Sequence, residues 1–152
     1  MTGVPGPGVA PIESRLRAAG LPALPRTAWL EVDLDRLAAN VAAILAKLPR
    51  RVSLEAVVKA DAYGHGAAAV AAAVLAAGAR GLCVATLDEA LELRRAGLRE
   101  PLLVLFPIPP DGAPIAARAR VDIAAGDPGL LERALAAYAA AGKRARRRLP
   151  PL

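Results

Sequence analysis

The stretch Val57-Val58-Lys59-Ala60-Asp61-Ala62-Tyr63-Gly64-His65-Gly66 places a lysine at the end of an apolar run and follows it with a glycine-flanked turn. Residues 54–58 are mainly apolar and predict a buried parallel strand. Burial of an unpaired ammonium group costs free energy or forces the amine to be neutral. A desolvated lysine at the carboxyl end of a strand suits Schiff-base chemistry with a carbonyl compound. The alternative is a lysine that only extends its ammonium into water, but the tyrosine and the Gly-His-Gly sequence that follow favour chemistry at Lys59.

These ten residues closely resemble the pyridoxal-phosphate attachment segment of bacterial alanine racemases. The resemblance implies that Lys59 binds pyridoxal 5'-phosphate through its amine and is one of two catalytic bases, the one that works on the D-alanine face. It also implies that Tyr63 hydrogen-bonds the cofactor phosphate. Many members of the family carry asparagine where this chain has Asp61.

Three further segments resemble the same family. Residues 29–37, Trp-Leu-Glu-Val-Asp-Leu-Asp-Arg-Leu, are typical of its amino-terminal domains, and residues 84–90 are also similar. Residues 101–106 resemble the strand whose terminal leucine packs near the cofactor, which makes Leu105 a candidate cofactor contact, although a plain core leucine explains it equally well. Phe106 stands where glycine is often found, and we expect it to narrow the mouth of the pocket.

The whole chain reads as alternating strands and helices. Apolar runs predict strands at residues 28–32, 53–59, 81–85, 101–106 and 121–124, and helical spacing predicts helices at about 12–19, 34–48, 66–77, 86–97, 113–119 and 127–142. Strands without polar alternation indicate parallel βα units. No Gly-x-Gly-x-x-Gly turn follows a strand, which argues against a dinucleotide-binding sheet. The strand-end lysine and the resemblance favour a (β/α)8 TIM-type barrel.

A complete barrel of this kind needs about 250 residues. The 152 residues therefore predict an α/β fold with an incomplete (β/α)8 barrel, about the first five βα units. Residues 1–25 are expected to be a disordered or partly helical extension, and residues 26–152 the amino-terminal part of the barrel. The sequence stops about where the sixth strand of the racemase barrel is expected to begin.

Other polar residues have simpler explanations than catalysis. His65 is the only histidine and has no acid at a recognisable spacing, so we expect a structural role in the turn. Thr86 and Glu89 form a capping-box pattern, and carboxylates in the first turn of a helix are favoured by its dipole, so no metal site is predicted there. Cys83 lies in an apolar run, cannot form an intrachain disulfide and is expected to be a small buried residue.

Composition limits the class of partner. The formal net charge is +6, but five positive charges lie between Lys143 and Arg148, and the rest of the chain carries 15 basic and 14 acidic residues. This tail lacks interleaved aromatic groups, so a nucleic-acid partner is the least favoured interpretation. No apolar run is long enough for a membrane span, no signal peptide is visible, and a single cysteine fits a reducing compartment, so the cytoplasm is the expected location.

The resemblance covers nearly all of the chain beyond residue 25 but only the first part of the family's length. It implies a homodimeric enzyme that interconverts L-alanine and D-alanine and supplies D-alanine for peptidoglycan. It also implies that the second base, a tyrosine from a carboxy-terminal β-domain, and most of the remaining cofactor contacts lie beyond Leu152, so this chain alone is expected to have little or no activity. The alternatives are another pyridoxal-phosphate barrel enzyme, such as an amino-acid decarboxylase or a broad-specificity racemase, and a non-enzymatic pyridoxal-phosphate-binding protein.

Overall fold

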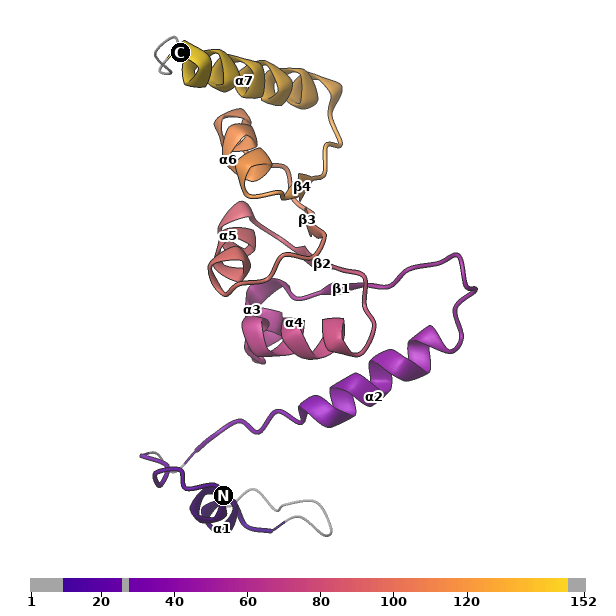
Figure 1. Ribbon diagram of the computed structural model, residues 1–152, viewed down its shortest axis with the longest axis vertical. Coiled ribbons are helices and arrows are strands. Elements are labelled where there is room, and N and C mark those ends of the chain that lie inside the picture. The colour runs from indigo at the N-terminus through magenta and orange to yellow at the C-terminus, as the bar shows by residue number, and fades with distance from the viewer. Residues whose placement is uncertain (1–9, 26–27, 148–152) are drawn as a thin grey trace. The chain divides into compact units, whose positions relative to one another are not determined.

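The computed structural model describes residues 10–25 and 28–147 (Figure 1). The chain divides into two units, Met1–Val32 and Asp33–Leu152, and each is described by itself. The expectations for residues 1–9 and 148–152 lie outside the described residues. The helices are α1 (Ile12–Ala18), α2 (Leu34–Leu45), α3 (Lys59–Gly64), α4 (Ala67–Ala76), α5 (Leu87–Arg95), α6 (Ala113–Arg118) and α7 (Pro128–Arg147), with a 3-10 turn η1 (Pro110–Gly112). The strands are β1 (Glu55–Val57), β2 (Gly81–Val84), β3 (Leu102–Val104) and β4 (Asp122–Ile123).

The first unit contains α1 and an irregular segment that follows it. The strand predicted at residues 28–32 is wrong, because these residues form no ladder in the described chain. A strand exists only with a hydrogen-bonded neighbour, and no segment within residues 10–25 and 28–147 pairs with this one. Its apolar side chains accordingly stay open to solvent, with Leu30 69% exposed. An ion pair between Arg15 and Glu31 links α1 to this segment.

The second unit is built on a four-stranded sheet whose strands are all parallel and lie in the order β1-β2-β3-β4. Val57, Cys83 and Leu103 lie in register across the first three strands. Each strand lies beside its predecessor, whereas a doubly wound sheet reverses its order at a switch point. The parallel α/β fold predicted from the sequence is confirmed, and the order of the strands is that of a partial barrel.

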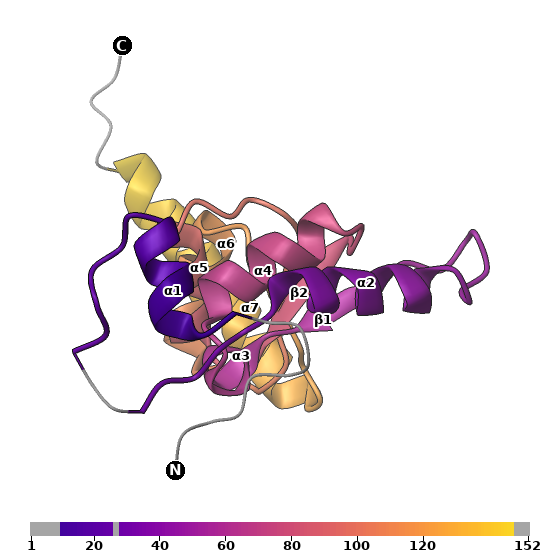
Figure 2. The ribbon, with the colours of Figure 1, turned by 90° about the horizontal axis from the view of Figure 1, so that it is seen from below.

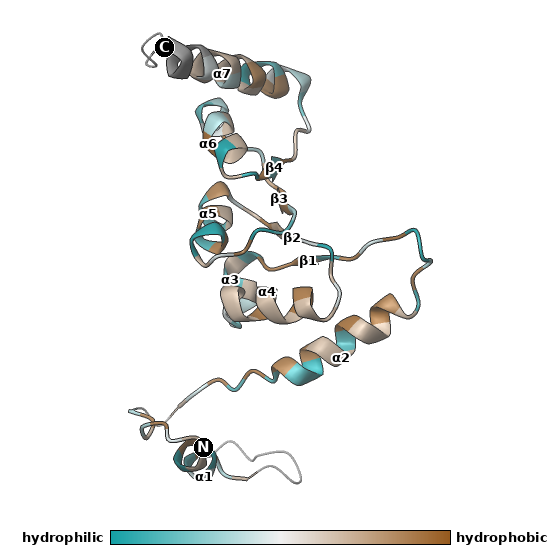
Figure 3. Ribbon diagram, viewed as in Figure 1, coloured by the Kyte–Doolittle hydropathy of each residue, from teal (hydrophilic) through white to brown (hydrophobic). Residues whose placement is uncertain are grey.

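The core lies between this sheet and the helices that connect its strands. Alternate residues of each strand face the helices, and Leu82, Val84, Leu102 and Val104 are at most 1% exposed. On the opposite face Val57 remains 43% exposed. Figure 1 shows α5 and α6 on the same side of the sheet, and Figure 3 shows α4 tan to brown along its length while α5 carries teal residues. One face of the sheet is therefore covered by helices, and the other is only partly open, because Cys83 is buried there beside the exposed Val57.

Helix α2 packs on α4 (Figure 2), and the two approach closely at a glycine. Gly78 follows α4 with a φ of +110°, a conformation that L side chains rarely adopt. A Cβ at this position would lie 2.9 Å from Leu45 Cδ1. The glycine stop predicted after α4 is confirmed, and it also allows the two helices to approach each other.

Most predicted helix boundaries agree with the structure. Asp33 accepts a hydrogen bond from the Arg36 amide at 2.9 Å and caps α2, and Asp127 accepts one from the Gly129 amide at 2.8 Å at the start of α7. The predicted end of the last helix at Gly142 is wrong, because α7 continues to Arg147. The alanine, lysine and arginine residues that follow Gly142 are good helix formers, so one glycine does not end the helix. Among residues 10–25 and 28–147, no helix has the length and apolar composition needed to cross a bilayer.

Arg94 joins α5 to the turn before β4. Its guanidinium donates hydrogen bonds to the carbonyl oxygens of Ala119 at 2.9 Å, Arg120 at 2.7 Å, Glu100 at 2.9 Å and Leu98 at 3.1 Å. A planar group with five N–H donors can serve several carbonyls at once, whereas an ammonium cannot reach all of them. This side chain therefore fixes one βα unit against the next.

We expect Arg94→Lys to lower the free energy of unfolding by about 2 kcal/mol, because carbonyl groups are left without donors. Chemical denaturation measures the change. The matched control is Arg95→Lys, at an exposed position on the same helix, with an expected change within about 0.5 kcal/mol. Equal effects of the two substitutions would contradict the role given to Arg94.

Candidate functional site

The candidate site lies at the carboxyl ends of three neighbouring strands. Lys59 follows β1, and Leu105 and Phe106 follow β3. Backbone hydrogen bonds continue the ladders past the strands: the Val58 amide donates to the Cys83 carbonyl at 2.8 Å, and the Leu105 amide donates to the Val84 carbonyl at 2.9 Å. Parallel pairing thus brings Lys59 and Leu105 to the same edge of the sheet, two strands apart.

Lys59 lies outside the strand that was predicted to carry it. The strand predicted at 53–59 is shorter, Glu55–Val57, and the backbone turns after Val58. Ala60, Asp61, Ala62 and Tyr63 all have positive φ values, from 50° to 56°. This is one turn of left-handed helix, which costs roughly 1–2 kcal/mol per non-glycine residue. Neighbouring groups must therefore hold the turn in place.

Glu89 provides one such group. Its Oε1 accepts a hydrogen bond from the Ala60 amide at 2.7 Å, and its Oε2 accepts one from the Ala85 amide at 2.7 Å and one from the Thr86 amide at 3.1 Å. The predicted capping box between Thr86 and Glu89 is confirmed. The bond to Ala60 was not foreseen, because a capping-box pattern indicates only contacts within its own helix end.

The remaining supports lie within the turn itself. Asp61 Oδ1 accepts the Ala67 amide at 2.6 Å at the start of α4, and the Asp61 carbonyl accepts the Gly66 amide at 2.9 Å. An asparagine oxygen could accept the same bond, so asparagine and aspartate are interchangeable for this contact. His65 Nδ1 lies 2.8 Å from the Ala62 carbonyl and donates to it, as a structural role in the turn requires.

The electrostatic environment of Glu89 keeps its carboxylate charged. Burial raises the pKa of this carboxyl. Hydrogen bonds from the Ala60, Ala85 and Thr86 amides and the nearby charge of Lys59 lower the pKa by more than burial raises it, so the pKa lies below its usual value. The sequence offered a plain helix-dipole explanation for this residue. The structure adds a cross-strand contact to that explanation.

The Lys59 ammonium does not lie in a fully apolar environment, contrary to the expectation from the sequence. The residue is half-buried, and its Nζ lies 5.6 Å from the centroid of the Phe106 ring. An aromatic face attracts a cation at this distance. Phe106 is 53% exposed and Tyr63 61% exposed, while Leu105 is half-buried. Phe106 therefore contacts the lysine directly, a role beyond the narrowing that its position suggested.

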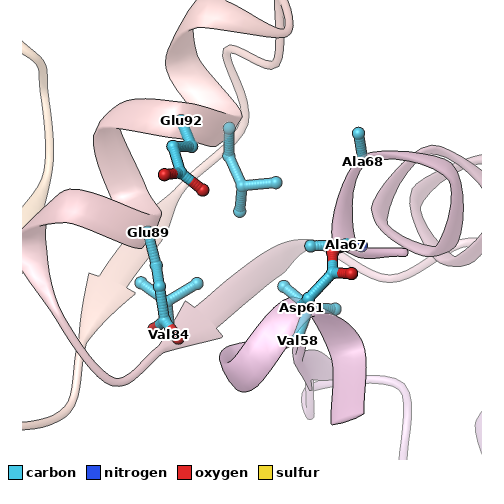
Figure 4. A pocket seen from close by; sticks show the side chains of 8 residues that line it. Val58, Asp61, Ala67, Ala68, Val84, Glu89 and Glu92 are labelled. Carbon is cyan, nitrogen blue, oxygen red and sulfur yellow. Dashed lines mark hydrogen bonds between the residues drawn. The ribbon is translucent and has the colours of Figure 1, made fainter. Parts of the chain in front are cut away.

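A pocket of about 190 Å³ lies beside the turn (Figure 4). Figure 4 shows Asp61 turned toward Ala67 at the start of α4, and Glu89 and Glu92 projecting from α5. The pocket is smaller than the 300–1,000 Å³ or so that is usual for small-molecule sites, and neither Lys59, Tyr63 nor Leu105 lines it. The carboxyl end of the sheet, where Lys59, Tyr63 and Leu105 lie, is therefore the better candidate site. In the part of the chain that the structure describes, no three His, Cys, Asp or Glu side chains are placed to hold a metal ion.

We expect Ala60→Gly to raise the free energy of unfolding by about 1 kcal/mol, because glycine adopts a positive φ without the steric cost that alanine carries. The matched control is Ala72→Gly at an exposed position in right-handed α4, where glycine is expected to cost about 1 kcal/mol. Thermal or chemical unfolding of both variants provides the measurement. Destabilisation by Ala60→Gly would show that the turn is not left-handed in solution.

Comparison with known proteins gives a consistent result. A family model described as the N-terminal domain of alanine racemase matches residues 32–149. The chain is 46% identical over 113 residues to an alanine racemase of Geobacillus kaustophilus, covering 74% of this chain and 29% of that protein. It is 50% identical over 92 residues to alanine racemase 1 of Bacillus subtilis, covering 60% of this chain and 24% of that protein. The chain thus spans less than a third of the length of these curated relatives.

Solved structures of racemases are also similar to this chain. The crystal structure of an alanine racemase from Bacillus anthracis with bound L-Ala-P has a TM-score of 0.72 and 43% identity, over 77% of this chain and 30% of that one. A histidine racemase from Leuconostoc mesenteroides also has a TM-score of 0.72, at 31% identity, over 79% of this chain and 32% of that one. The fold is therefore shared by racemases named for different amino acids.

Proposed function

The chain belongs to the alanine racemase family, and from that membership we propose that it forms the cofactor-anchoring part of a pyridoxal-phosphate-dependent racemase acting on alanine. The observation that carries the proposal is the position of Lys59, in a turn at the carboxyl end of β1, beside the ends of β2 and β3. In α/β barrels this edge is where reacting groups are placed.

The groups at this edge suit the chemistry of the cofactor. The aldehyde of pyridoxal phosphate requires a primary amine for covalent attachment, and Lys59 provides one at the carboxyl end of the sheet. The two ion pairs among the described residues involve Arg15 and Arg36, so no carboxylate is paired with the Lys59 ammonium there. A phosphate requires hydrogen-bond donors, and the exposed phenol of Tyr63, three residues beyond Ala60 in the same turn, is one. We assign Lys59 to covalent attachment, Tyr63 to the phosphate and Leu105 to an apolar contact.

Racemisation needs a proton to leave one face of Cα and return on the other. The cofactor, when bound, accepts the electron pair that the lost proton leaves behind. Lys59 holds or transfers the proton on one face, as the resemblance implies for the D-alanine side. A second base must act from the opposite face, and we assign no residue of this chain to that role. The whole enzyme is proposed to be a cytoplasmic homodimer that supplies D-alanine for the cell wall.

A second candidate is a racemase for another amino acid. The observation that favours it is the histidine racemase, whose TM-score equals that of the Bacillus anthracis alanine racemase. Phe106 bears on this choice, because a large ring beside Lys59 leaves less room than a glycine would for a substrate side chain. A small substrate such as alanine fits that constraint better than a large one does.

Borohydride reduction after incubation with pyridoxal phosphate tests the attachment site. The chain has three lysines, Lys47, Lys59 and Lys143, so peptide mapping gives a clear result. We expect saturable labelling at Lys59 and only slow labelling at Lys47 and Lys143, because a built site concentrates the cofactor at one amine. The control, Lys47→Arg, should leave the label in place, whereas Lys59→Arg should remove it. Equal labelling of all three lysines would refute the proposal.

We expect the 152-residue polypeptide, assayed alone with pyridoxal phosphate, not to interconvert L-alanine and D-alanine, because only one of the two bases is assigned within it. Chiral chromatography of the reaction mixture measures the conversion, with a complete alanine racemase as the positive control. Interconversion that survives in wild type and disappears in Lys59→Arg would show that this polypeptide contains both bases.

A further inference from the structure

We propose that Glu89 is a positioning residue for Lys59: its carboxylate joins the ends of β1 and β2 and holds the left-handed turn in the orientation that brings the lysine amine over the sheet edge. The inference rests on the proposed function of Lys59 as the cofactor-binding residue. It extends that function to a residue on a different element, 29 positions further along the chain than Ala60.

The Glu89 carboxylate accepts hydrogen bonds from backbone amides at both strand ends. One oxygen accepts the Ala60 amide at 2.7 Å, and the other accepts the Ala85 and Thr86 amides at 2.7 Å and 3.1 Å. The Ala60 N–H belongs to the peptide group that joins it to Lys59. Because a peptide group is planar, fixing this N–H also fixes the direction in which the backbone leaves the Lys59 Cα.

The left-handed turn is energetically costly, and it begins directly after Lys59. Val58, the residue before Lys59, is 1% exposed and is anchored in the core, so the backbone direction is set up to that point. The next residues are left-handed, which alanine disfavours. A bond to the first residue after Lys59 acts at the position where the handedness changes. The Nζ–Phe106 contact, at the end of β3, shows that the lysine side chain leans across the sheet edge.

Positioning of Lys59 and capping of α5 depend on different hydrogen bonds of Glu89. A capping box requires Thr86 and Glu89 only, and both of its bonds are present. The bond to Ala60 is not needed to start α5. Loss of capping should weaken the helix, whereas loss of the Ala60 bond should change the reactivity of Lys59, so the two roles can be measured separately.

The test compares three variants of the full chain by the rate of borohydride-trapped pyridoxal-phosphate labelling at Lys59 relative to Lys47. Glu89→Gln presents an amide nitrogen to at least one backbone donor and removes the carboxylate charge, and we expect the Lys59 rate to fall about tenfold, as the loss of a hydrogen bond to a charged acceptor implies. Glu92→Gln is the matched control, since Glu92 is exposed on the same helix and lines the same pocket. Thr86→Val removes the capping hydroxyl while keeping the Glu89 carboxylate. Both controls should label Lys59 at the wild-type rate, whatever Thr86→Val does to the melting temperature.

Wild-type labelling of Lys59 in folded Glu89→Gln would overturn the positioning role, and so would an equal loss of labelling in Thr86→Val. If Glu89→Gln does not fold, Glu89→Asp replaces it, because a carboxylate shorter by one methylene keeps its charge and cannot serve both strand ends. Wild-type labelling of Lys59 in Glu89→Asp, or an equal loss of labelling in Thr86→Val, would then overturn the positioning role.

Hydrogen exchange at the Ala60 amide provides a readout without the cofactor. We expect this amide to be protected in wild type and Glu92→Gln and less protected in Glu89→Gln, whose side chain keeps one acceptor oxygen in place of two. An unprotected Ala60 amide in wild type would contradict the positioning role. Protection that depends on Glu89, together with unselective lysine labelling in wild type, would show instead that the proposed function is wrong while the contact is real.

Discussion

The parallel ladder between β1 and β2 determines the position of Lys59. Val58 still donates to the Cys83 carbonyl and is buried, so the backbone reaches the end of the sheet in a fixed direction. The chain must then reverse toward α4 within a few residues, and it does so through a left-handed turn. Backbone donors and acceptors freed by that turn need partners, and Glu89, Asp61 and His65 meet this need. The amine, the turn and the following helix are therefore one connected structure.

Much of this architecture could be predicted from the sequence, because it depends on local rules. Apolar runs indicated the paired strands, and Thr86 with Glu89 indicated the start of α5. The segment at 28–32 could not be judged in the same way, since a strand needs a partner and its residues do not show whether one is present. Likewise, alanines 60 and 62 give no sign of positive φ, because their conformation is imposed by tertiary contacts against their own preference.

The residues of the candidate site also differ in whether the sequence alone could identify them. Lys59 and Tyr63 could be selected from one short stretch because they are close in sequence. Glu89 and Phe106 could not be connected with Lys59 from the sequence, since their contacts cross from one βα unit to the next. The family relationship covers residues 32–149, a span that includes Lys59, Tyr63 and Leu105, to which we assign roles in the proposed site. The Phe106 ring, whose centroid lies 5.6 Å from Lys59 Nζ, is the feature that bears on the proposed choice of amino acid.

The open face and the terminal strands of the sheet affect how this polypeptide behaves in solution. β1 and β4 each have one neighbour among the described strands, so each presents a row of unpaired backbone donors and acceptors. Such rows accept strands from other chains. Val57 belongs to β1 and is 43% exposed, so it adds an apolar surface at this strand. We therefore expect association of the isolated polypeptide through these strands to increase with its concentration, so dilute samples are the appropriate starting point for work on Lys59.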